Sequence, residues 1–385
     1  MWNLIHAHHT FFESSRRWPS WADSDAAIRQ ARKDIDWLAI LPAQAAQQVL
    51  KAYRQAWSNY WNGTHRRPTW KTRRARRAVD VPQARDLNLT RLNHKWATVV
   101  IPKVGVVKMR WHRDMPERVT GARVVREATG WMLVIRGENH LVKPRLRRAE
   151  QGSVGIDRGV THTLALSDGS FIDQCPTLTP GERKRLYRLE RKAARQRATK
   201  PRGHKASRRL LRTYAQIGGL KARQARRRYD FAHQATAGLV AAGTAVLVVE
   251  DLGVANMTRT ARGSVEAPGV NVNQKSGLNR AILDQGWTQI LTLLTYKADQ
   301  AGARVIRVRP YGTSQTCHRC GSTAEGQRES QAVFRCADPA CGWTGNADTN
   351  AAIVMKHRGQ EVALQDVEPN ATRQAVKRQN PKTAA

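Results

Sequence analysis

The sequence predicts a multidomain chain of the α+β and α/β classes. A helical N-terminal region and a small antiparallel β unit precede a larger α/β domain. The length of 385 residues suits two or three domains of ordinary size. Apolar residues have helical spacing over residues 1–62, but they fall into short runs separated by turn residues over 87–146. After residue 152, compact apolar runs alternate with long helical segments, which is typical of a sheet covered by helices.

Residues 1–62 are predicted to be helical because their apolar side chains recur at the spacing of one inward-facing stripe. Pro42 suits the first turn of a helix, and Gly63 suits the stop that follows. A basic segment comes next at 66–77, where seven of the twelve positions are Lys or Arg and none is acidic. The helical region is therefore expected to end where this basic segment begins.

Three strand-like runs, at 96–101, 105–111 and 131–135, define the small β unit. The turn residues between and around them are Pro102, Gly105, Gly121 and Gly130. Because closure removes exposed sheet edges, we expect these strands to form an antiparallel barrel.

The larger domain is predicted to begin near Gly152. Its expected strands are 153–157, 163–167, 171–172, 245–250 and 304–308. Its expected helices are about 180–198, 205–242 and 279–301, with a last one from about 347. Residues 253–278, rich in Gly, Asn, Ser and Thr, are predicted to form a mobile loop that acts as a lid, and the polar tail after Gly359 is predicted to be disordered.

The charge of the chain predicts a polyanionic partner. Lys and Arg number 66 against 30 acids, a formal net charge of +36, and a nucleic acid is the usual partner of such a chain. A membrane surface would require a basic amphipathic helix or a lipidation signal, and the sequence contains neither. No apolar stretch reaches the roughly 18 residues of a membrane span, and the N-terminus lacks the pattern of a signal peptide. A soluble cytoplasmic protein is therefore predicted.

Positive charge is concentrated in two segments, 66–77 and 183–228, the second of which has 19 Lys or Arg and a single acid, Glu190. Solvated charged faces are the alternative interpretation, but such faces normally interleave both signs. Trp61 and Trp70 can either stack on bases or belong to the core. The candidate nucleic-acid contacts in the first segment are Arg66, Arg67, Lys71, Arg73, Arg74, Arg76 and Arg77.

Four of the five cysteines lie close together, in a pattern unlike a secreted disulfide framework. They are Cys317, Cys320, Cys336 and Cys341. The two pairs have the spacing of chelating knuckles, each followed by a glycine (Gly321 or Gly342), and this predicts a closed, structural Cys₄ zinc ribbon. Two reducible disulfides or four buried thiols remain as alternatives, and His318 is a weaker candidate ligand. Cys175 is expected to pack as a small hydrophobe.

Three acids are singled out by their positions. Asp157 and Glu250 end buried strands, and Asp348 opens a helix. Carboxylates at the ends of neighbouring strands converge at one edge of a sheet, where they repel one another unless cations neutralise them. The trio is therefore predicted to hold two Mg²⁺ roughly 4 Å apart for phosphodiester hydrolysis. As alternatives, Asp348 can be only a helix N-cap, and Glu250 can be only paired with an arginine.

Short motifs surround these acids and cysteines: GIDRGV at 155–160, VEDL at 249–252, TSQTCHRCG at 313–321 and DTNAA at 348–352. Others are LAILP at 38–42, QVL at 48–50, AW at 56–57, RPTWK at 67–71 and RYDFAH at 228–233. Together they resemble the TnpB (OrfB) family of insertion-sequence-associated, RNA-guided nucleases, compact relatives of type V CRISPR effectors, over about residues 1–355.

The resemblance implies an N-terminal wedge β-barrel with a helical recognition insert, followed by an RNase H-like (RuvC) nuclease domain with an inserted zinc ribbon. The implied division is 1–78 helical recognition region, 79–150 wedge barrel, 151–311 with 346–358 RuvC-like domain, 312–345 zinc ribbon and 359–385 disordered tail. It also implies that Asp157, Glu250 and Asp348 bind the catalytic Mg²⁺ and that the four cysteines bind Zn²⁺. A guide RNA encoded beside the gene would select target DNA next to a short motif.

One departure from the family pattern lies at the start of the chain. Family members usually place a strand and a helix ahead of a Val-Trp-Asn-like motif, whereas this sequence begins at Met1-Trp2-Asn3. Either the natural start lies upstream or the barrel lacks its first strand.

The function predicted is that of an RNA-guided, Mg²⁺-dependent DNA endonuclease. A transposase on the same fold that acts without guide RNA is one alternative. A nuclease-inactive RNA-guided DNA-binding regulator is another, which the presence of all three acids disfavours.

Overall fold

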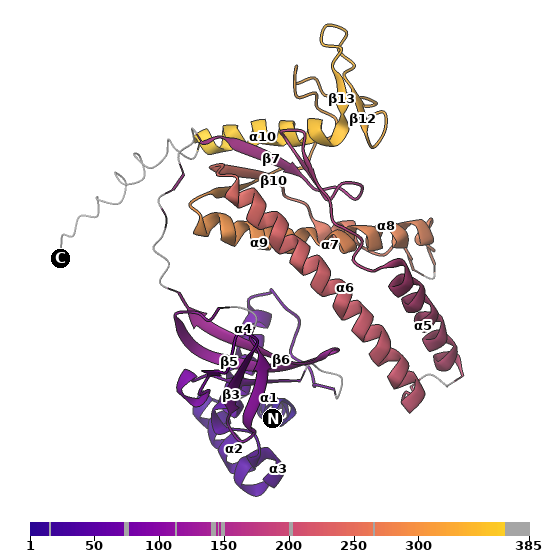
Figure 1. Ribbon diagram of the computed structural model, residues 1–385. Helices are drawn as coiled ribbons and strands as arrows, with labels where there is room; N and C mark the ends of the chain where they lie inside the picture. The colour runs from indigo at the N-terminus through magenta and orange to yellow at the C-terminus, as the bar shows by residue number, and fades with distance from the viewer. Residues whose placement is uncertain are drawn as a thin grey trace, which may run out of the picture. The chain divides into compact units, whose positions relative to one another are not determined.

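The computed structural model describes residues 1–14, 17–72, 77–111, 114–139, 144, 146–147, 151–199, 203–264 and 266–365. The chain divides into two compact units, Met1–Leu141 and Val142–Ala385 (Figure 1). Within the described ranges, no helix has both the length and the apolar content needed to cross a bilayer.

The first unit begins with helices α1 (Trp2–Ser14), α2 (Trp21–Asp34), α3 (Asp36–Ala39) and α4 (Ala43–Trp61), which confirm the helical prediction for this region. Ser20 starts α2 through a capping box with Asp23. Pro42 is the N-cap of α4 rather than a residue of its first turn. The core of these helices consists of Ile5, Ile28, Ala46, Leu50, Tyr53 and Trp57.

The strands of the first unit form two antiparallel sheets. These strands are β1 (Ala78–Val81), β2 (Thr90–Arg91), β3 (Trp96–Ile101), β4 (Gly105–Arg110), β5 (Arg118–Glu127) and β6 (Gly130–Glu138). The sheet orders are β1-β5-β6 and β2-β3-β4, and both sheets contribute side chains to one buried cluster that includes Val81, Val99 and Ala122. The runs at 96–101, 105–111 and 131–135 are confirmed as strands, β5 was not predicted, and a closed barrel stays a prediction.

The second unit is built on a five-stranded sheet in the order β11-β10-β7-β8-β9. Its strands are β7 (Ser153–Asp157), β8 (Leu164–Leu166), β9 (Phe171–Ile172), β10 (Val246–Glu250) and β11 (Arg304–Val308). Strands β7, β10 and β11 run parallel, whereas β8 pairs antiparallel with both β7 and β9. All five predicted strands are confirmed, because compact apolar runs bounded by turn residues are a strong signal for buried strands.

Helices cover both faces of this sheet. Helices α6 (Arg208–Ala241) and α9 (Trp287–Gln300) pack with Leu247 and Val249 on one face. Helix α10 (Ala347–Gln365) packs with Val246 and Val248 on the other (Figure 1). The alternation along β10 thus follows the two-residue period of a strand buried on both sides.

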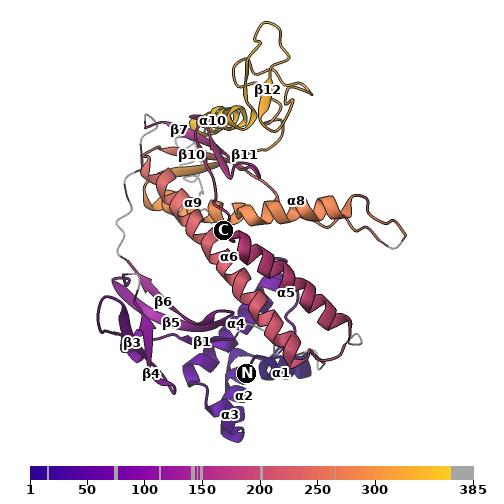
Figure 2. The same cartoon turned by 45° about the vertical axis from the view of Figure 1, so that its right-hand side comes forward.

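Helix α5 (Pro180–Ala198) packs beside α6, and the two form a long hairpin that matches the predicted helices closely (Figure 2). Thr179 and Glu182 form a capping box at the start of α5, and Pro180 occupies its first turn.

The segment predicted as the loop 253–278 and the helix 279–301 is organised differently. It contains α7 (Val254–Met257) and α8 (Val272–Gln285), and α8 ends at Gly286, whose φ of 68° separates it from α9. The Asn279 amide donates to the Thr258 carbonyl at 3.0 Å, which ties α8 to the residues that follow α7. The loop and single-helix predictions were therefore wrong in part.

Helix α10 continues beyond the predicted end of order at Gly359. A Cβ atom at this position would lie 2.3 Å from Cγ2 of Val248, so glycine here allows the helix to lie close to the sheet. The disorder prediction was wrong for 359–365, while 366–385 lie outside the described residues.

Candidate active site

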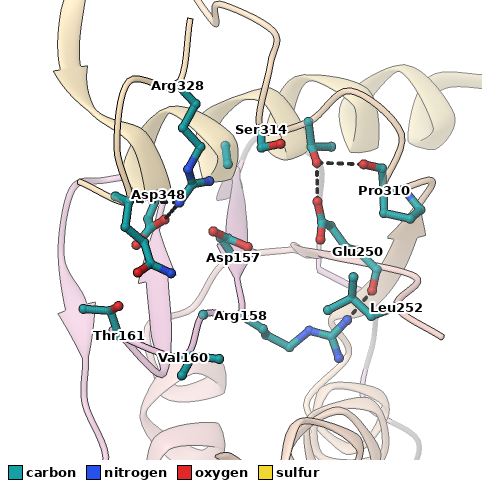
Figure 3. A pocket seen from close by; sticks show the side chains of 14 residues that line it. Asp157, Arg158, Val160, Thr161, Glu250, Leu252, Pro310, Ser314, Arg328 and Asp348 are labelled. Carbon is teal, nitrogen blue, oxygen red and sulfur yellow. Dashed lines mark hydrogen bonds and ion pairs between the residues drawn. The ribbon is translucent and has the colours of Figure 1, made fainter. Parts of the chain in front are cut away.

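Asp157 and Glu250 end two neighbouring parallel strands, β7 and β10. The register pairs Ile156 with Val249, so the two acids follow the last paired positions at the same edge of the sheet. Both carboxylates point into one pocket there (Figure 3).

Asp348 reaches the same pocket from the first turn of α10. The Oδ1 atom of Asn346 accepts from the backbone N–H groups of Asp348 and Thr349, both at 3.0 Å. Asn346 therefore performs the capping role that was considered for Asp348, and the Asp348 carboxylate is available to the pocket. A Cβ atom on Gly155 would lie 1.8 Å from the Ala352 carbonyl oxygen, so only glycine in β7 permits α10 to approach this closely.

The three acids line one pocket of about 310 Å³. Other residues that line it include Arg158, Thr161, Thr313, Ser314, Arg328 and Gln331. Residues that lie far apart in the sequence, at the ends of two strands and the start of one helix, are therefore brought together as the sequence analysis expected.

The three carboxylates of the pocket repel one another, and bound cations would relieve this repulsion. Burial, followed by the negative charges of Glu250 and Asp348, raises the pKa of Asp157 to about 7. Three carboxylates held together in this way are unfavourable unless protons or metal ions neutralise them. Oxygen ligands of this kind suit Mg²⁺, so the residues present fit a divalent ion.

Three pocket residues were not identified from the sequence. Arg328 donates to Oδ1 of Asp348 at 2.7 Å, and the two side chains are 28% and 9% exposed. The hydroxyl of Thr313 donates to the carboxylate of Glu250, whereas the guanidinium of Arg158 donates to the backbone carbonyl of Glu250. Arg328 comes from a turn-rich insert with no periodic pattern, so only the motif beginning at Thr313 gave any signal that this region contributes.

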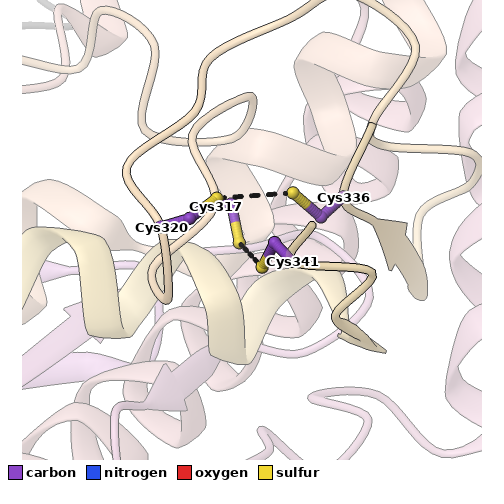
Figure 4. A group of neighbouring side chains, drawn as sticks. All are labelled: Cys317, Cys320, Cys336 and Cys341. Atoms are coloured by element: carbon purple, nitrogen blue, oxygen red, sulfur yellow. Dashed lines mark hydrogen bonds between the residues drawn. The ribbon is translucent and has the colours of Figure 1, made fainter. Parts of the chain in front are cut away.

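The four cysteines form a compact cluster (Figure 4). Their sulfurs all lie within 4.8 Å of one another, with Cys317–Cys341 at 3.9 Å and Cys320–Cys336 at 3.5 Å. All four are free thiols, which rules out the disulfide alternative in this structure. Zn–S bonds of 2.3 Å in a tetrahedron place sulfurs about 3.8 Å apart, so the cluster fits a metal ion such as zinc.

The two other residues considered with this cluster lie outside it. Nδ1 of His318 lies 2.9 Å from Oδ1 of Asn350, and its ring packs edge-on against Trp343. Cys175 is exposed in the connection between β9 and α5, so the prediction that it packs as a small hydrophobe was wrong.

The described part of the first basic segment is held along α1. The indole N–H of Trp2 donates to the Thr69 carbonyl at 3.0 Å, and the Asn3 amide exchanges two hydrogen bonds with the backbone of Lys71. The exposed candidates Arg66, Arg67, Lys71 and Arg77 lie in described residues, whereas Arg73, Arg74 and Arg76 lie outside them.

The aromatic residues next to this segment differ in burial. Trp57 is buried in the helical core, whereas Trp61 is 59% exposed and Trp70 is 54% exposed. Arg67 lies over the Trp57 ring at 5.3 Å and also pairs with Glu13. The first basic segment therefore has exposed cations and, at Trp70 and nearby Trp61, exposed indoles.

Most described residues of the second basic segment lie in α5 and in the first part of α6. Glu182 pairs with Arg223 and Arg227, and Glu190 pairs with Lys221 at 2.9 Å. The 19 Lys and Arg residues between 183 and 228 exceed what these acids neutralise, so the hairpin presents a strongly positive surface.

Two family models match the chain: "Probable transposase" (OrfB_IS605) over residues 140–261 and "Cas12f1-like, TNB domain" over 287–355. The "Putative RNA-guided DNA endonuclease InsQ" of Escherichia coli K12 is 34% identical over 86% of this chain and 77% of its own length. The "Putative RNA-guided DNA endonuclease" of Streptomyces pristinaespiralis is 27% identical over 86% of this chain and 76% of its own length. A solved Cas12f1–sgRNA–target DNA complex shares the fold, with a TM-score of 0.53 and 14% identity over 92% of this chain and 79% of that one.

Proposed function

The chain belongs to the TnpB (OrfB) family of RNA-guided DNA endonucleases, and we propose that Asp157, Glu250 and Asp348 hold the Mg²⁺ ions with which it hydrolyses DNA. It is an RNA-guided DNA endonuclease of the TnpB type, and its partners are a guide RNA and a target DNA. The observation that carries the catalytic assignment is the single pocket that all three acids line.

The topology of the second unit supports the same assignment. Three antiparallel strands are followed by two parallel strands on the other side of β7, which is the arrangement of an RNase H-like (RuvC) domain. We propose the RuvC-like domain at 151–311 and 346–358, with the insert 312–345 as a zinc ribbon that binds structural Zn²⁺ through its four cysteines. In the N-terminal part of the chain, 1–78 would be the helical recognition region and 79–150 the wedge barrel.

Each pocket residue has a distinct part in this proposal. Two divalent ions bound by the carboxylates would activate the attacking water and stabilise the leaving oxygen. Thr313 and Arg328 fix the orientation of the Glu250 and Asp348 carboxylates by direct hydrogen bonds. Arg158 ties the end of β10 to the end of β7 through the Glu250 carbonyl, which keeps the two strand ends together.

The test of this function begins with the RNA that copurifies with the chain. Sequencing that RNA defines the guide, and a plasmid carrying the complementary target and a randomised flanking sequence is then incubated with the complex. We expect cleavage that requires both the matching target and Mg²⁺ and that stops on chelation. Strand-joined products formed without RNA would favour the transposase instead, and binding without cleavage would favour the regulator.

We further propose that the surface formed by Arg66, Lys71, Trp61 and Trp70 contacts nucleic acid. Cations without intervening acids attract phosphates and release counterions on binding. Exposed indoles provide faces on which bases can stack. Since hydrogen bonds to α1 anchor the backbone at Thr69 and Lys71, nucleic-acid binding would need little further ordering of this backbone.

Replacing both Arg66 and Lys71 by Ala is expected to weaken guide-RNA binding and to make it less sensitive to salt. Each lost phosphate contact lowers the slope of log K against log [salt] by about 0.7 to 0.9. The measurement is a filter-binding titration with the copurifying RNA between about 50 and 200 mM salt, the range over which such contacts act. The control is Lys33→Ala with Lys51→Ala, which removes the same charge from exposed positions on α2 and α4. Equal slopes for the two double variants would show that the surface is only a solvated charged face.

A further inference from the structure

The cysteine insert leaves the five-stranded sheet after β11 and returns through β13 (Thr344–Asn346) directly before α10. Its outgoing stretch supplies Thr313 and Ser314 to the acidic pocket, and the insert itself supplies Arg328 and Gln331. The position of the insert on α10 therefore decides where these groups stand relative to the three acids.

One buried side chain on α10 holds the insert at its first cysteine knuckle. Asn350 is 0% exposed. Its Oδ1 accepts from the backbone N–H of His318 at 3.0 Å and lies 2.9 Å from the His318 ring, while its Nδ2 donates to the Thr316 carbonyl at 2.7 Å. The side-chain amide of Asn350 thus hydrogen-bonds to the backbone on both sides of Cys317. A buried amide that uses both ends in this way is costly to replace.

The same helix turn carries Asp348. Asn350 lies two residues after Asp348, and Arg328 of the insert donates to the Asp348 carboxylate. The insert therefore contacts α10 at two places. Arg328 of the insert bonds to Asp348 of α10, and the cysteine knuckle of the insert bonds to Asn350 of α10. With a metal ion bound, the four cysteines would tie the two knuckles of the insert together, so a shift at the second contact would change the first.

We propose that Asn350 is a positioning residue: it locks the metal-binding knuckle to α10 and thereby keeps Arg328 and Asp348 in the alignment that divalent-ion binding requires. The inference rests on the proposed function of the three acids, and it gives the cysteine cluster a part in setting the geometry of the acidic pocket. Asn350 itself touches no reacting atom.

The proposal is tested with Asn350→Ala in the full chain bound to its guide RNA. We expect the variant to keep its zinc and guide RNA and to cleave guided DNA about tenfold or more slowly under single-turnover conditions. The Mg²⁺ concentration for half-maximal rate is expected to rise several-fold, because a misaligned Asp348 binds the ion more weakly. Gln360→Ala, which removes an exposed amide from the same helix, is expected to match the parent chain.

Two further measurements separate positioning from mere folding. His318→Ala leaves the backbone N–H contact in place, so its effect is expected to be smaller and not additive with Asn350→Ala. Mn²⁺ binding to the chain, followed by electron paramagnetic resonance, reports the pocket without requiring cleavage. Weaker Mn²⁺ binding by Asn350→Ala would support the inference even if the parent chain does not cut DNA. Unchanged Mn²⁺ binding, an unchanged Mg²⁺ requirement, or loss of zinc in step with loss of rate would overturn it.

Discussion

Asp157→Asn is expected to abolish guided DNA cleavage, by about 10³-fold or more, while guide RNA still copurifies with the chain. The substitution keeps the size of the side chain and removes the charge of the acid whose pKa is raised by burial and by the two neighbouring carboxylates. Guide-RNA binding should persist because the substitution leaves unchanged the basic surface that we propose for nucleic-acid binding. The measurements are plasmid cleavage and quantification of bound RNA.

The same variant should differ from the parent chain in its stability without metal. The pKa of Asp157 is about 7 in the folded state and about 3.8 in the unfolded chain. The unfolded state therefore binds fewer protons between these values, and the carboxylate destabilises the metal-free fold increasingly as pH rises from about 4 to about 7. Asp157→Asn should be the more stable chain at pH 8 without metal and lose this advantage near pH 4. Addition of Mg²⁺ should stabilise only the parent chain.

The matched control is Asp251→Asn, one residue beyond Glu250. Asp251 is exposed and pairs with Arg307 at 3.6 Å, outside the residues that line the pocket. The Asp251→Asn chain should cleave DNA like the parent chain and should gain no stability at pH 8. Full activity of Asp157→Asn would remove Asp157 from the catalytic set.

The strands that position the acids were predictable because their signal is local. A compact apolar run such as 246–250 ends in a single acid, and parallel strands bring such ends to one edge. The close approach of α10 to β7 depends instead on Gly155 lying against Ala352, a contact between residues far apart in the chain. Periodicity cannot report such a contact, so the sequence suggested that Asp348 joins the site without showing how.

The elements that were not predicted have residue compositions that favour a different secondary structure. Strand β5 contains three arginines and a central Gly121, and this composition resembles a turn more than a strand. Helix α8 begins among Asn, Gln and Ser residues, which favour loops. Tertiary hydrogen bonds, such as that from Nζ of Lys275 to the Met257 carbonyl at 2.8 Å, stabilise the helix there instead. Arg328 was missed for a third reason: its function comes from the fold of the insert rather than from any pattern around it.

We expect Cys336→Ser to lose the bound metal, and we expect the insert to unfold as a result. Structural zinc contributes about 10 to 16 kcal/mol of binding free energy in small zinc-binding peptides, and an insert with only the short pair β12 (Val333–Arg335) and β13 has little other core to replace it. Metal analysis should give one zinc per parent chain and none in the variant. Limited proteolysis should then cut within 312–345 while the sheet and its helices, whose cores contain none of the four cysteines, stay resistant.

Cleavage should fall with the metal even though the three acids remain. Without an ordered insert, Arg328 no longer pairs with Asp348, and the Asn350 amide loses the knuckle backbone to which it is bonded. Guide RNA should still bind, which separates this loss from general unfolding. Cys175→Ser, at the exposed cysteine outside the cluster, should retain zinc, protease resistance and cleavage. A zinc-free Cys336→Ser chain that still cuts guided DNA at the parent rate would show that the cluster has no influence on the acidic pocket.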